Sequence, residues 1–344
     1  MHFSRMAALL FSTVLVACSG SGATGDGSGS GGSSGGTGSS GGSTSSGGSG
    51  GGGNSSGGGS SGSGGGSSSG GPEAGVSEQS ITLTMGPFTV PASSEVFKCQ
   101  TFANPFAGKD ADIKEYEEHM TLGSHHMFIF FSPGATDGPV GDCPSGGLEY
   151  HPYPFSAQSK DATLTYPPTV GSRIPGSMGF MLNAHFLNVT GADYQATLTV
   201  TLHLALPGAV TQYAGVVFMD NLGISIPPTQ MPVTSTRTCT LPQDMNVMAS
   251  ASHMHTRSTN FVATSGSQTL YTSTSWSNPM PAWYDPPIHL TSGSQVTWSC
   301  TYVNDTASTL TFGESATANV MCIYTMQFYP ITDPNNPTIT CQMP

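Results

Sequence analysis

The chain has 344 residues, of which 8% are charged, and its 8 Lys and Arg against 20 Asp and Glu give a net charge of -12. An acidic chain of this kind repels phosphate backbones and anionic lipid surfaces, so nucleic acid is excluded as a partner. The length is sufficient for one large or two medium-sized domains beyond any targeting segment.

Residues 1–18 have the pattern of a signal peptide for export. Arg5 supplies the positive charge, and the apolar segment after it is too short to cross a bilayer. The segment ends in Leu15-Val16-Ala17-Cys18, a pattern typical of bacterial lipoproteins, and we expect Cys18 to carry a lipid after cleavage. The alternative is an ordinary signal peptide in which the cysteine is incidental.

Residues 19–75 are almost entirely Gly and Ser. Such a segment has no side chains that could offset the entropy cost of ordering the backbone, so we expect a disordered linker with a reach on the order of 40 Å. Ser19 directly after Cys18 is typical of lipoproteins sorted to the outer membrane. We therefore expect an exported bacterial lipoprotein on the outer membrane or cell surface, in contact with the membrane only through its lipid anchor.

The rest of the chain predicts an all-β fold, because short apolar or alternating segments are separated by Gly, Pro, Asn and Asp. We expect two consecutive antiparallel β-sandwich domains, jelly-roll-like, at 76–208 and 209–344. Residues 110–119, rich in Lys and Glu, are the exception and predict a helix or a single helical turn. The predicted strands are 80–85, 127–131, 179–187, 196–206, 213–219, 260–264, 295–303 and 320–329.

Six cysteines follow Cys18, an even number in an exported chain, and they predict three disulfides. Six cysteines allow fifteen pairings, so their spacing alone selects none. Metal binding by some of the thiolates is the alternative, although the chain has no CxxC spacing. The six are Cys99, Cys143, Cys239, Cys300, Cys322 and Cys341.

Three clusters of soft-metal ligands are the most informative feature of the folded region: His125-His126-Met127, His253-Met254-His255 and Met321 beside Cys322. On a strand, residues i and i+2 face the same way, so His253 and His255 can bind one ion. The alternative is a pair of histidines on the solvated face of a sheet. The clusters favour copper, because a thioether prefers Cu(I) and imidazoles accept either copper oxidation state or zinc.

The other two clusters are weaker evidence when taken alone. His125 and His126 are adjacent and point to opposite faces of a regular strand, so they can share an ion only if the chain bulges at Gly123-Ser124. Met321 by itself is typical of core packing, but a disulfide at Cys322 would hold its backbone in place.

The clusters carry a resemblance to a known family. His125 to Phe131, Ala184-His185-Phe186, the interval from Cys239 to His255, and Met321-Cys322 occur in the order seen in the copper type II, ascorbate-dependent monooxygenases. That family includes peptidylglycine α-hydroxylating monooxygenase and dopamine β-monooxygenase. The resemblance spans about residues 80–344 and leaves the linker out.

The resemblance implies two β-sandwiches that each hold one copper ion and face each other across a solvent-filled cleft. His125, His126 and His185 would bind the electron-relay copper, and the catalytic copper, where O₂ reacts, would be bound by His253, His255 and Met321. Ascorbate or a similar donor would supply the electrons. The implied disulfides are Cys99–Cys143, Cys239–Cys341 and Cys300–Cys322.

Departures from the family bear on the substrate. The peptide-amidating members hold a peptide carboxylate with side chains whose matching positions here are Ala251, Ile323 and Thr325. We therefore expect a small or hydrophobic substrate hydroxylated with O₂. The alternative function is non-catalytic copper binding at the surface for storage, sensing or delivery. The sequence contains no signal that fixes an oligomeric state.

Overall fold

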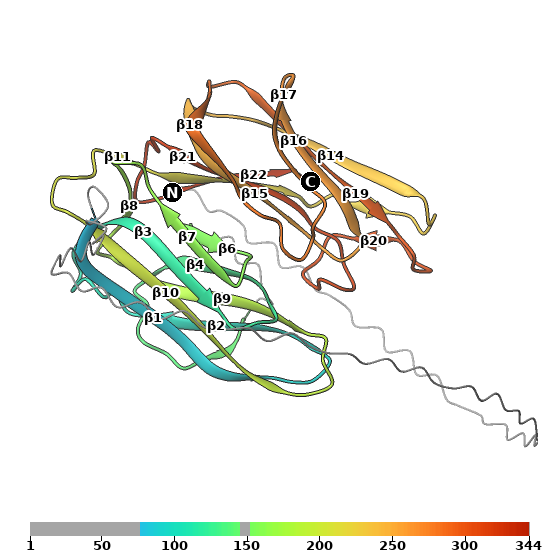
Figure 1. The fold of residues 1–344 in the computed structure, drawn as a ribbon, viewed down its shortest axis with the longest axis horizontal. Helices are drawn as coiled ribbons and strands as arrows, with labels where there is room; N and C mark the ends of the chain where they lie inside the picture. The colour runs from blue at the N-terminus through green and yellow to red at the C-terminus, as the bar shows by residue number, and fades with distance from the viewer. Residues whose placement is uncertain (1–75, 145–151, 344) are drawn as a thin grey trace, which may run out of the picture. The chain divides into compact units, whose positions relative to one another are not determined.

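The computed structural model describes residues 76–144 and 152–343. All the regular secondary structure in these ranges is β-strand, which confirms the all-β prediction. The predicted signal peptide at 1–18, the lipidation site Cys18 and the linker at 19–75 lie outside the described residues. Within the described ranges no helix is long and apolar enough to cross a membrane. Figure 1 shows the two groups of sheets, the first running from β1 to β11 and the second from β12 to β22.

The first sandwich contains two sheets. One has the order β1-β10-β3-β8-β11, with β7 also paired to β3, and the other has the order β5-β2-β9-β4-β6. All these pairs are antiparallel except β8 with β11. The strands are β1 (Val76–Val90), β2 (Ser94–Phe102), β3 (Ala111–Met120), β4 (Ser124–Pro133), β5 (Gly141–Asp142), β6 (Phe155–Ala157), β7 (Asp161–Thr165), β8 (Val170–Ile174), β9 (Met178–Asn188), β10 (Tyr194–Ala205) and β11 (Gln212–Tyr213).

Alternation of apolar and polar residues explains this packing. In β10, Ala196, Leu198, Val200 and Leu202 are fully buried, while the residues between them are partly exposed. Their partners come from the other sheet, and the two sheets meet in ring contacts such as Phe88 with Phe186 at 5.4 Å.

The predicted helix at 110–119 is wrong, because this segment forms β3. Lys and Glu have good helix propensity, but β3 pairs with β10 on one side and with β7 and β8 on the other, so its backbone is satisfied in two ladders. Tyr116 and Met120 are also fully buried in the core. Pairing and burial outweigh a propensity difference of less than about 1 kcal/mol per residue.

The second sandwich packs the sheet β18-β15-β21-β12-β22 on the sheet β14-β19-β16-β17, with the two-stranded sheet β13-β20 beside them. Trp298 and Tyr324 lie in its core, and the Trp298 indole donates to the Cys322 carbonyl at 3.2 Å. The strands are β12 (Gly215–Asn221), β13 (Ser225–Ile226), β14 (Pro232–Thr240), β15 (Met245–Met254), β16 (Ser258–Ser265), β17 (Gln268–Ser273), β18 (Ala282–Leu290), β19 (Gln295–Val303), β20 (Leu310–Thr311), β21 (Cys322–Tyr329) and β22 (Thr338–Met343).

All six cysteines form disulfides in the pairs that the resemblance implied: Cys99–Cys143, Cys239–Cys341 and Cys300–Cys322. The alternative of thiolate metal ligands is therefore wrong for these residues. The last bond joins β19 to the start of β21 and so connects the two sheets of the second sandwich, directly beside Met321.

The two sandwiches contact each other through a buried apolar group, which we call the apolar interface. It brings side chains of the first sandwich (Phe130, Tyr153, Met181 and the Cys99–Cys143 disulfide) onto side chains of the second (Val216, Phe218, Met321 and Ile323). The rings of Tyr153 and Phe218 are 6.0 Å apart. The solvent-filled cleft implied by the resemblance is, along this contact, a closed hydrophobic seam.

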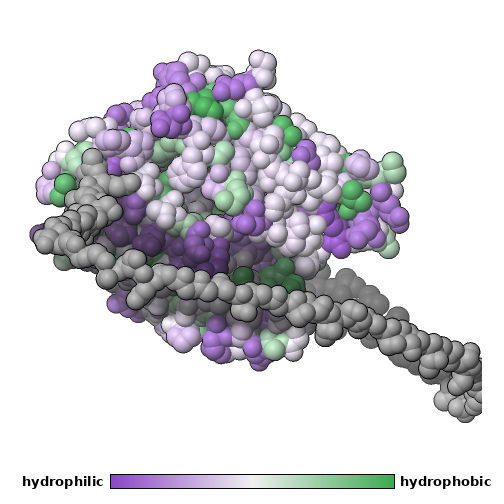
Figure 2. Space-filling view, viewed as in Figure 1, coloured by the Kyte–Doolittle hydropathy of each residue, from purple (hydrophilic) through white to green (hydrophobic). Residues whose placement is uncertain are grey.

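The surface visible in Figure 2 is mainly white to purple, with green apolar residues in scattered spots. This distribution fits a chain whose apolar residues are used inside two cores and one interface.

Removal of the Cys300–Cys322 disulfide should lower stability measurably. The bond closes a loop of 22 residues, and constraint of the unfolded chain by such a loop contributes about 3 kcal/mol. We expect the Cys300→Ala/Cys322→Ala variant to lose about that much free energy of unfolding in urea titrations followed by tryptophan fluorescence. An unchanged urea midpoint would contradict this expectation.

Candidate metal centre

A β-bulge at the start of β4 turns two adjacent histidines to the same side. Ser124 pairs with Phe186 and His126 pairs with His185, so His125 is the extra residue between them. Gly123 precedes the bulge with φ of 97°, and a Cβ there would lie 2.4 Å from the Tyr194 hydroxyl. A side chain at this position would therefore be strained and would clash. The bulge that two adjacent metal-binding histidines require is therefore present at the start of the strand, directly after Gly123-Ser124.

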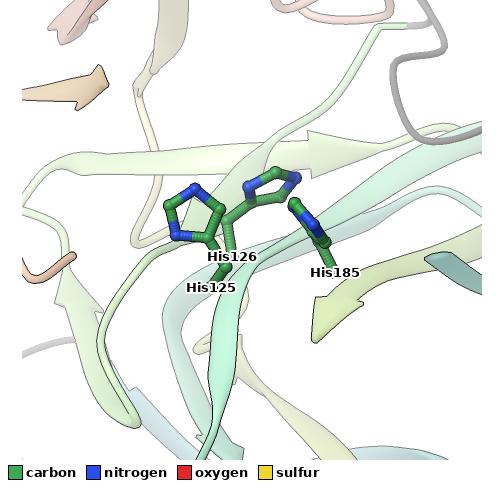
Figure 3. A group of neighbouring side chains, drawn as sticks. All are labelled: His125, His126 and His185. Carbon is green, nitrogen blue, oxygen red and sulfur yellow. The ribbon is translucent and has the colours of Figure 1, made fainter. Parts of the chain in front are cut away.

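His185 on β9 completes the first group of three imidazoles. Its ring centroid is 5.0 Å from that of His125 and 4.9 Å from that of His126, and Figure 3 shows the three rings gathered on one side of the strands that carry them. One ring nitrogen from each residue lies within 4.8 Å of the others. Phe97 stacks on His185 at 4.0 Å and fixes the plane of its ring.

His253 and His255, at the end of β15, join the same cluster. The His253 ring is 4.8 Å from both His125 and His126, and the His255 ring is 5.7 Å from His125. His125, His253 and His255 form a second group with nitrogens within 4.8 Å of one another. We call these five residues the imidazole cluster. His125 belongs to both groups, so the structure has one continuous cluster where the resemblance implied two separate sites.

Strand pairing places the backbone of Met321 next to that of His255, a member of the cluster. Met254 pairs with Cys322, and His255 and Met321 are the next residues beyond the ends of their strands. The Met321 side chain is 1% exposed and belongs to the apolar interface. Its role as a copper ligand remains a prediction.

The cluster is rich in buried nitrogens without hydrogen-bond partners. Among the described residues seven such ring nitrogens occur in it: Nε2 of His125, both nitrogens of His126, Nδ1 of His185, Nε2 of His253 and both nitrogens of His255. Each unpaired buried polar group costs about 1–3 kcal/mol. Coordination to a metal ion would satisfy several of these nitrogens at once, so the residues fit a metal.

Burial also keeps these imidazoles neutral. Removal from water, followed by the proximity of the other rings, lowers the pKa of His125, His126 and His253 well below the usual value of 6.5, and lowers that of His255 to about 3. A neutral imidazole offers a lone pair to a metal ion. An all-imidazole set without carboxylates suits copper or zinc and does not suit calcium or magnesium.

Glu95 of β2 orients His185. Its carboxylate accepts a hydrogen bond from His185 Nε2 at 2.8 Å, which leaves Nδ1 for a metal ion. The same carboxylate accepts from the Ser315 hydroxyl and the Ala316 backbone N–H, both at 2.6 Å, so it joins the two sandwiches. Burial raises the Glu95 pKa, but the hydrogen bonds from these three donors outweigh it and hold that pKa at about 2.

Gln158, just after β6, has the same role for His253. Its side-chain oxygen accepts from His253 Nδ1 at 2.8 Å and leaves Nε2 of that ring without a partner among the described residues. The Gln158 amide nitrogen donates to the Trp276 carbonyl at 2.9 Å. Sequence reasoning missed both Glu95 and Gln158, because neither belongs to a motif and each acts through residues distant in the chain.

A cavity of about 300 Å³ lies directly beside the cluster. His126 and His253 form part of its wall, and both sandwiches contribute to its lining. The site therefore combines a set of metal ligands with space for a small molecule.

Comparisons with known proteins do not assign a family. A scan against protein-family models finds no match, and a search of curated protein sequences finds no relative. Among solved structures, the major capsid protein P2 from bacteriophage PM2 matches 75% of this chain and 100% of its own length, with a TM-score of 0.33 and 4% identity. PNGF-II matches 74% of this chain and 60% of its own, with a TM-score of 0.22 and 7% identity. Likenesses this distant carry no argument about function.

The stability of the metal-free protein should fall as pH drops from 7 to 5. The unfolded chain binds a proton at each imidazole near pH 6.5, whereas the buried rings of His125, His126, His253 and His255 remain neutral in the folded state. Below pH 6.5 each such ring therefore costs up to about 1.4 kcal/mol of unfolding free energy per pH unit. Urea titrations across this range measure the slope. The His126→Gln variant should show a shallower slope, and an equal slope would contradict the assignment.

Loss of the Glu95 carboxylate should weaken metal binding. Removal of an outer partner of a ligating histidine typically costs about 10- to 100-fold in affinity, and we expect Glu95→Ala to lose that much Cu affinity in competition titrations with a chromophoric chelator. Glu117→Ala is the matched control, because that carboxylate is exposed on β3. Equal affinities in the two variants would refute the role of Glu95.

Proposed function

We propose that this protein is a copper-dependent monooxygenase, which uses O₂ and ascorbate or a similar one-electron donor to hydroxylate a C–H bond of a small or hydrophobic substrate. One observation carries the proposal: five imidazoles, four of them buried and His253 partly buried, present seven buried nitrogens without partners beside a cavity that opens between the two sandwiches. The order of the ligand motifs along the chain, which resembles that of the copper type II, ascorbate-dependent monooxygenases, supports the same proposal.

Two copper ions are proposed, one held by His125, His126 and His185 and the other by His253, His255 and Met321. Copper supplies the one-electron redox chemistry that activation of O₂ requires. In the net reaction one oxygen atom enters the substrate C–H bond and the other leaves as water, with two electrons from the donor and two protons.

The protein's own groups prepare the site. Glu95 and Gln158 fix which nitrogen of His185 and of His253 is free, so these rings need no rearrangement when they bind a metal ion. The low pKa values keep four of the rings unprotonated at neutral pH. The apolar interface excludes water from one side of the cluster, which protects reactive intermediates from side reactions.

The cavity distinguishes this proposal from non-catalytic copper storage, sensing or delivery. A storage or delivery site has no need for a substrate-sized space walled by two of its ligands, His126 and His253. The proposed location is the outer surface of a bacterial cell, where Cys18 and the Gly/Ser linker would attach the enzyme to the membrane.

Hydroxylation by the copper-loaded protein should depend on the thioether at position 321. We expect ascorbate-dependent product formation, followed by oxygen uptake and mass spectrometry, to fall by at least about 100-fold in Met321→Leu, because loss of a ligand exceeds the ~10–100-fold effect of an outer partner. Leu keeps the buried volume, so folding should be preserved.

The His203→Ala variant serves as the control for Met321→Leu, because His203 lies on the outward face of β10.

Two copper ions per chain are expected by metal analysis. Tight copper binding without turnover would support the non-catalytic alternative, and one copper or zinc ion per chain would refute the two-copper assignment.

A further inference from the structure

The floor of the cavity is the face of β15 and β21 that carries His253. In this antiparallel pair His253 lies opposite Ile323, Ala251 opposite Thr325, and Ala249 opposite Gln327. All six residues line the cavity, as does Phe218 of the neighbouring strand β12. The floor therefore runs from a proposed copper ligand at one end to Gln327 at the other, over about 13 Å at roughly 3.3 Å per residue.

The cavity offers no charged partner to a ligand. Apart from its two histidines, Asp161 is the one ionisable residue among the described residues of the lining. Asp161 lies at the exposed edge, where it already binds Lys160 and His119. A carboxylate or ammonium group placed on the floor would lose its hydration without gaining an opposite charge, which strongly disfavours binding.

The remainder of the wall is mostly apolar, and so is the rim. Phe128, Phe155 and Leu164 come from the first sandwich. Met280 and Trp283, which also line the cavity, are 67% and 52% exposed. Large apolar side chains are exposed at few positions of the described surface, and two of these positions lie at the rim of the cavity. They favour the entry of an apolar molecule.

Gln327 provides a polar contact at the far end of the floor. Ser252, the other lining residue with a buried, unpartnered oxygen, alternates with His253 along β15 and therefore points to the opposite face of the sheet. The side-chain oxygen of Gln327 is buried and has no hydrogen-bond partner among the described residues. A buried acceptor of this kind costs free energy until a donor reaches it. A ligand that carries a hydroxyl or amide N–H at one end would satisfy Gln327 while its apolar part lies against Ile323 and Phe218.

We propose that the cavity binds an uncharged, mainly apolar molecule whose one hydrogen-bond donor is held by Gln327, with the opposite end beside His253. This inference rests on the proposed function, because it names the substrate class of the same site. Gln327 is thus a specificity-determining residue that distinguishes neutral alcohols or amides from acids, amines and pure hydrocarbons.

Calorimetric titration of the full chain, with and without copper, tests the proposal with four probes of similar size. These are 4-phenyl-1-butanol, butylbenzene, 4-phenylbutanoate and 4-phenylbutylamine. We expect the alcohol to bind about 5- to 10-fold more tightly than butylbenzene, as one hydrogen bond allows, and at least about 10-fold more tightly than either charged probe. Equal or tighter binding of a charged probe would overturn the proposal.

Two variants isolate Gln327. In Gln327→Leu the preference for the alcohol over butylbenzene should disappear, while the matched control Gln195→Leu, at an exposed position of β10 outside the cavity, should retain it. Gln327→Glu should shift the preference to 4-phenylbutylamine, which keeps the test informative if the leucine variant folds poorly. Retention of the alcohol preference in both Gln327 variants would refute the anchor.

The outcomes separate this inference from the proposed function. Selective binding of the alcohol without ascorbate-dependent hydroxylation would leave the binding site standing and remove the monooxygenase. Turnover of the charged probes in preference to the alcohol would support the monooxygenase and overturn the substrate class.

Discussion

The apolar contact between the two sandwiches is the constraint on which the site depends. Phe130 and Tyr153 of one sandwich pack on Phe218 and Ile323 of the other, and this seam holds the start of β4 against the end of β15. The histidines at these two strand ends are consequently brought within one cluster. Without the seam, neither the second group of three imidazoles nor the shared cavity would exist, because both use residues from each side.

Burial of four imidazoles, with the partly buried His253 beside them, is unfavourable for the metal-free protein. Their rings are withdrawn from water, close to one another, and largely without donors or acceptors to pair with. Such an arrangement persists only because the surrounding sheets, disulfides and outer hydrogen bonds over-determine it. A local arrangement that lowers stability but is held by a rigid scaffold is typical of functional sites. This is the physical reason for interpreting the cluster as a candidate metal centre.

Much of the fold could be predicted from the sequence, because alternating polar and apolar residues, or a short apolar run, indicate a strand with at least one buried face. The segments around Leu198 and Trp298 alternate in this way, the segment around Phe131 is a continuous apolar run, and all three are strands in the structure. The segment around Tyr116 was mispredicted as a helix, since its Lys and Glu content concealed a core strand whose pairing partners lie far away in the chain.

The site was predictable only in part. The bulge at His125 could be anticipated from Gly123, and the i, i+2 spacing of His253 and His255 from strand geometry. The merging of the histidines into one cluster could not, because sequence spacing within each sandwich says nothing about how two sandwich faces pack. Glu95 and Gln158 were missed for the same reason: each stabilises the site through contacts across the seam.

The hydrogen bonds of Glu95 and Gln158 make the orientation of the histidines depend on both sandwiches being present. Each residue belongs to the first sandwich, yet one is held by Ser315 and Ala316 and the other holds His253, all in the second. If the proposed metal centre is correct, the two sandwiches produced as separate polypeptides would therefore bind a metal ion less tightly than the intact chain. Each would have flexible, poorly oriented imidazoles, and a chelate effect that exists only in the joined molecule would be lost.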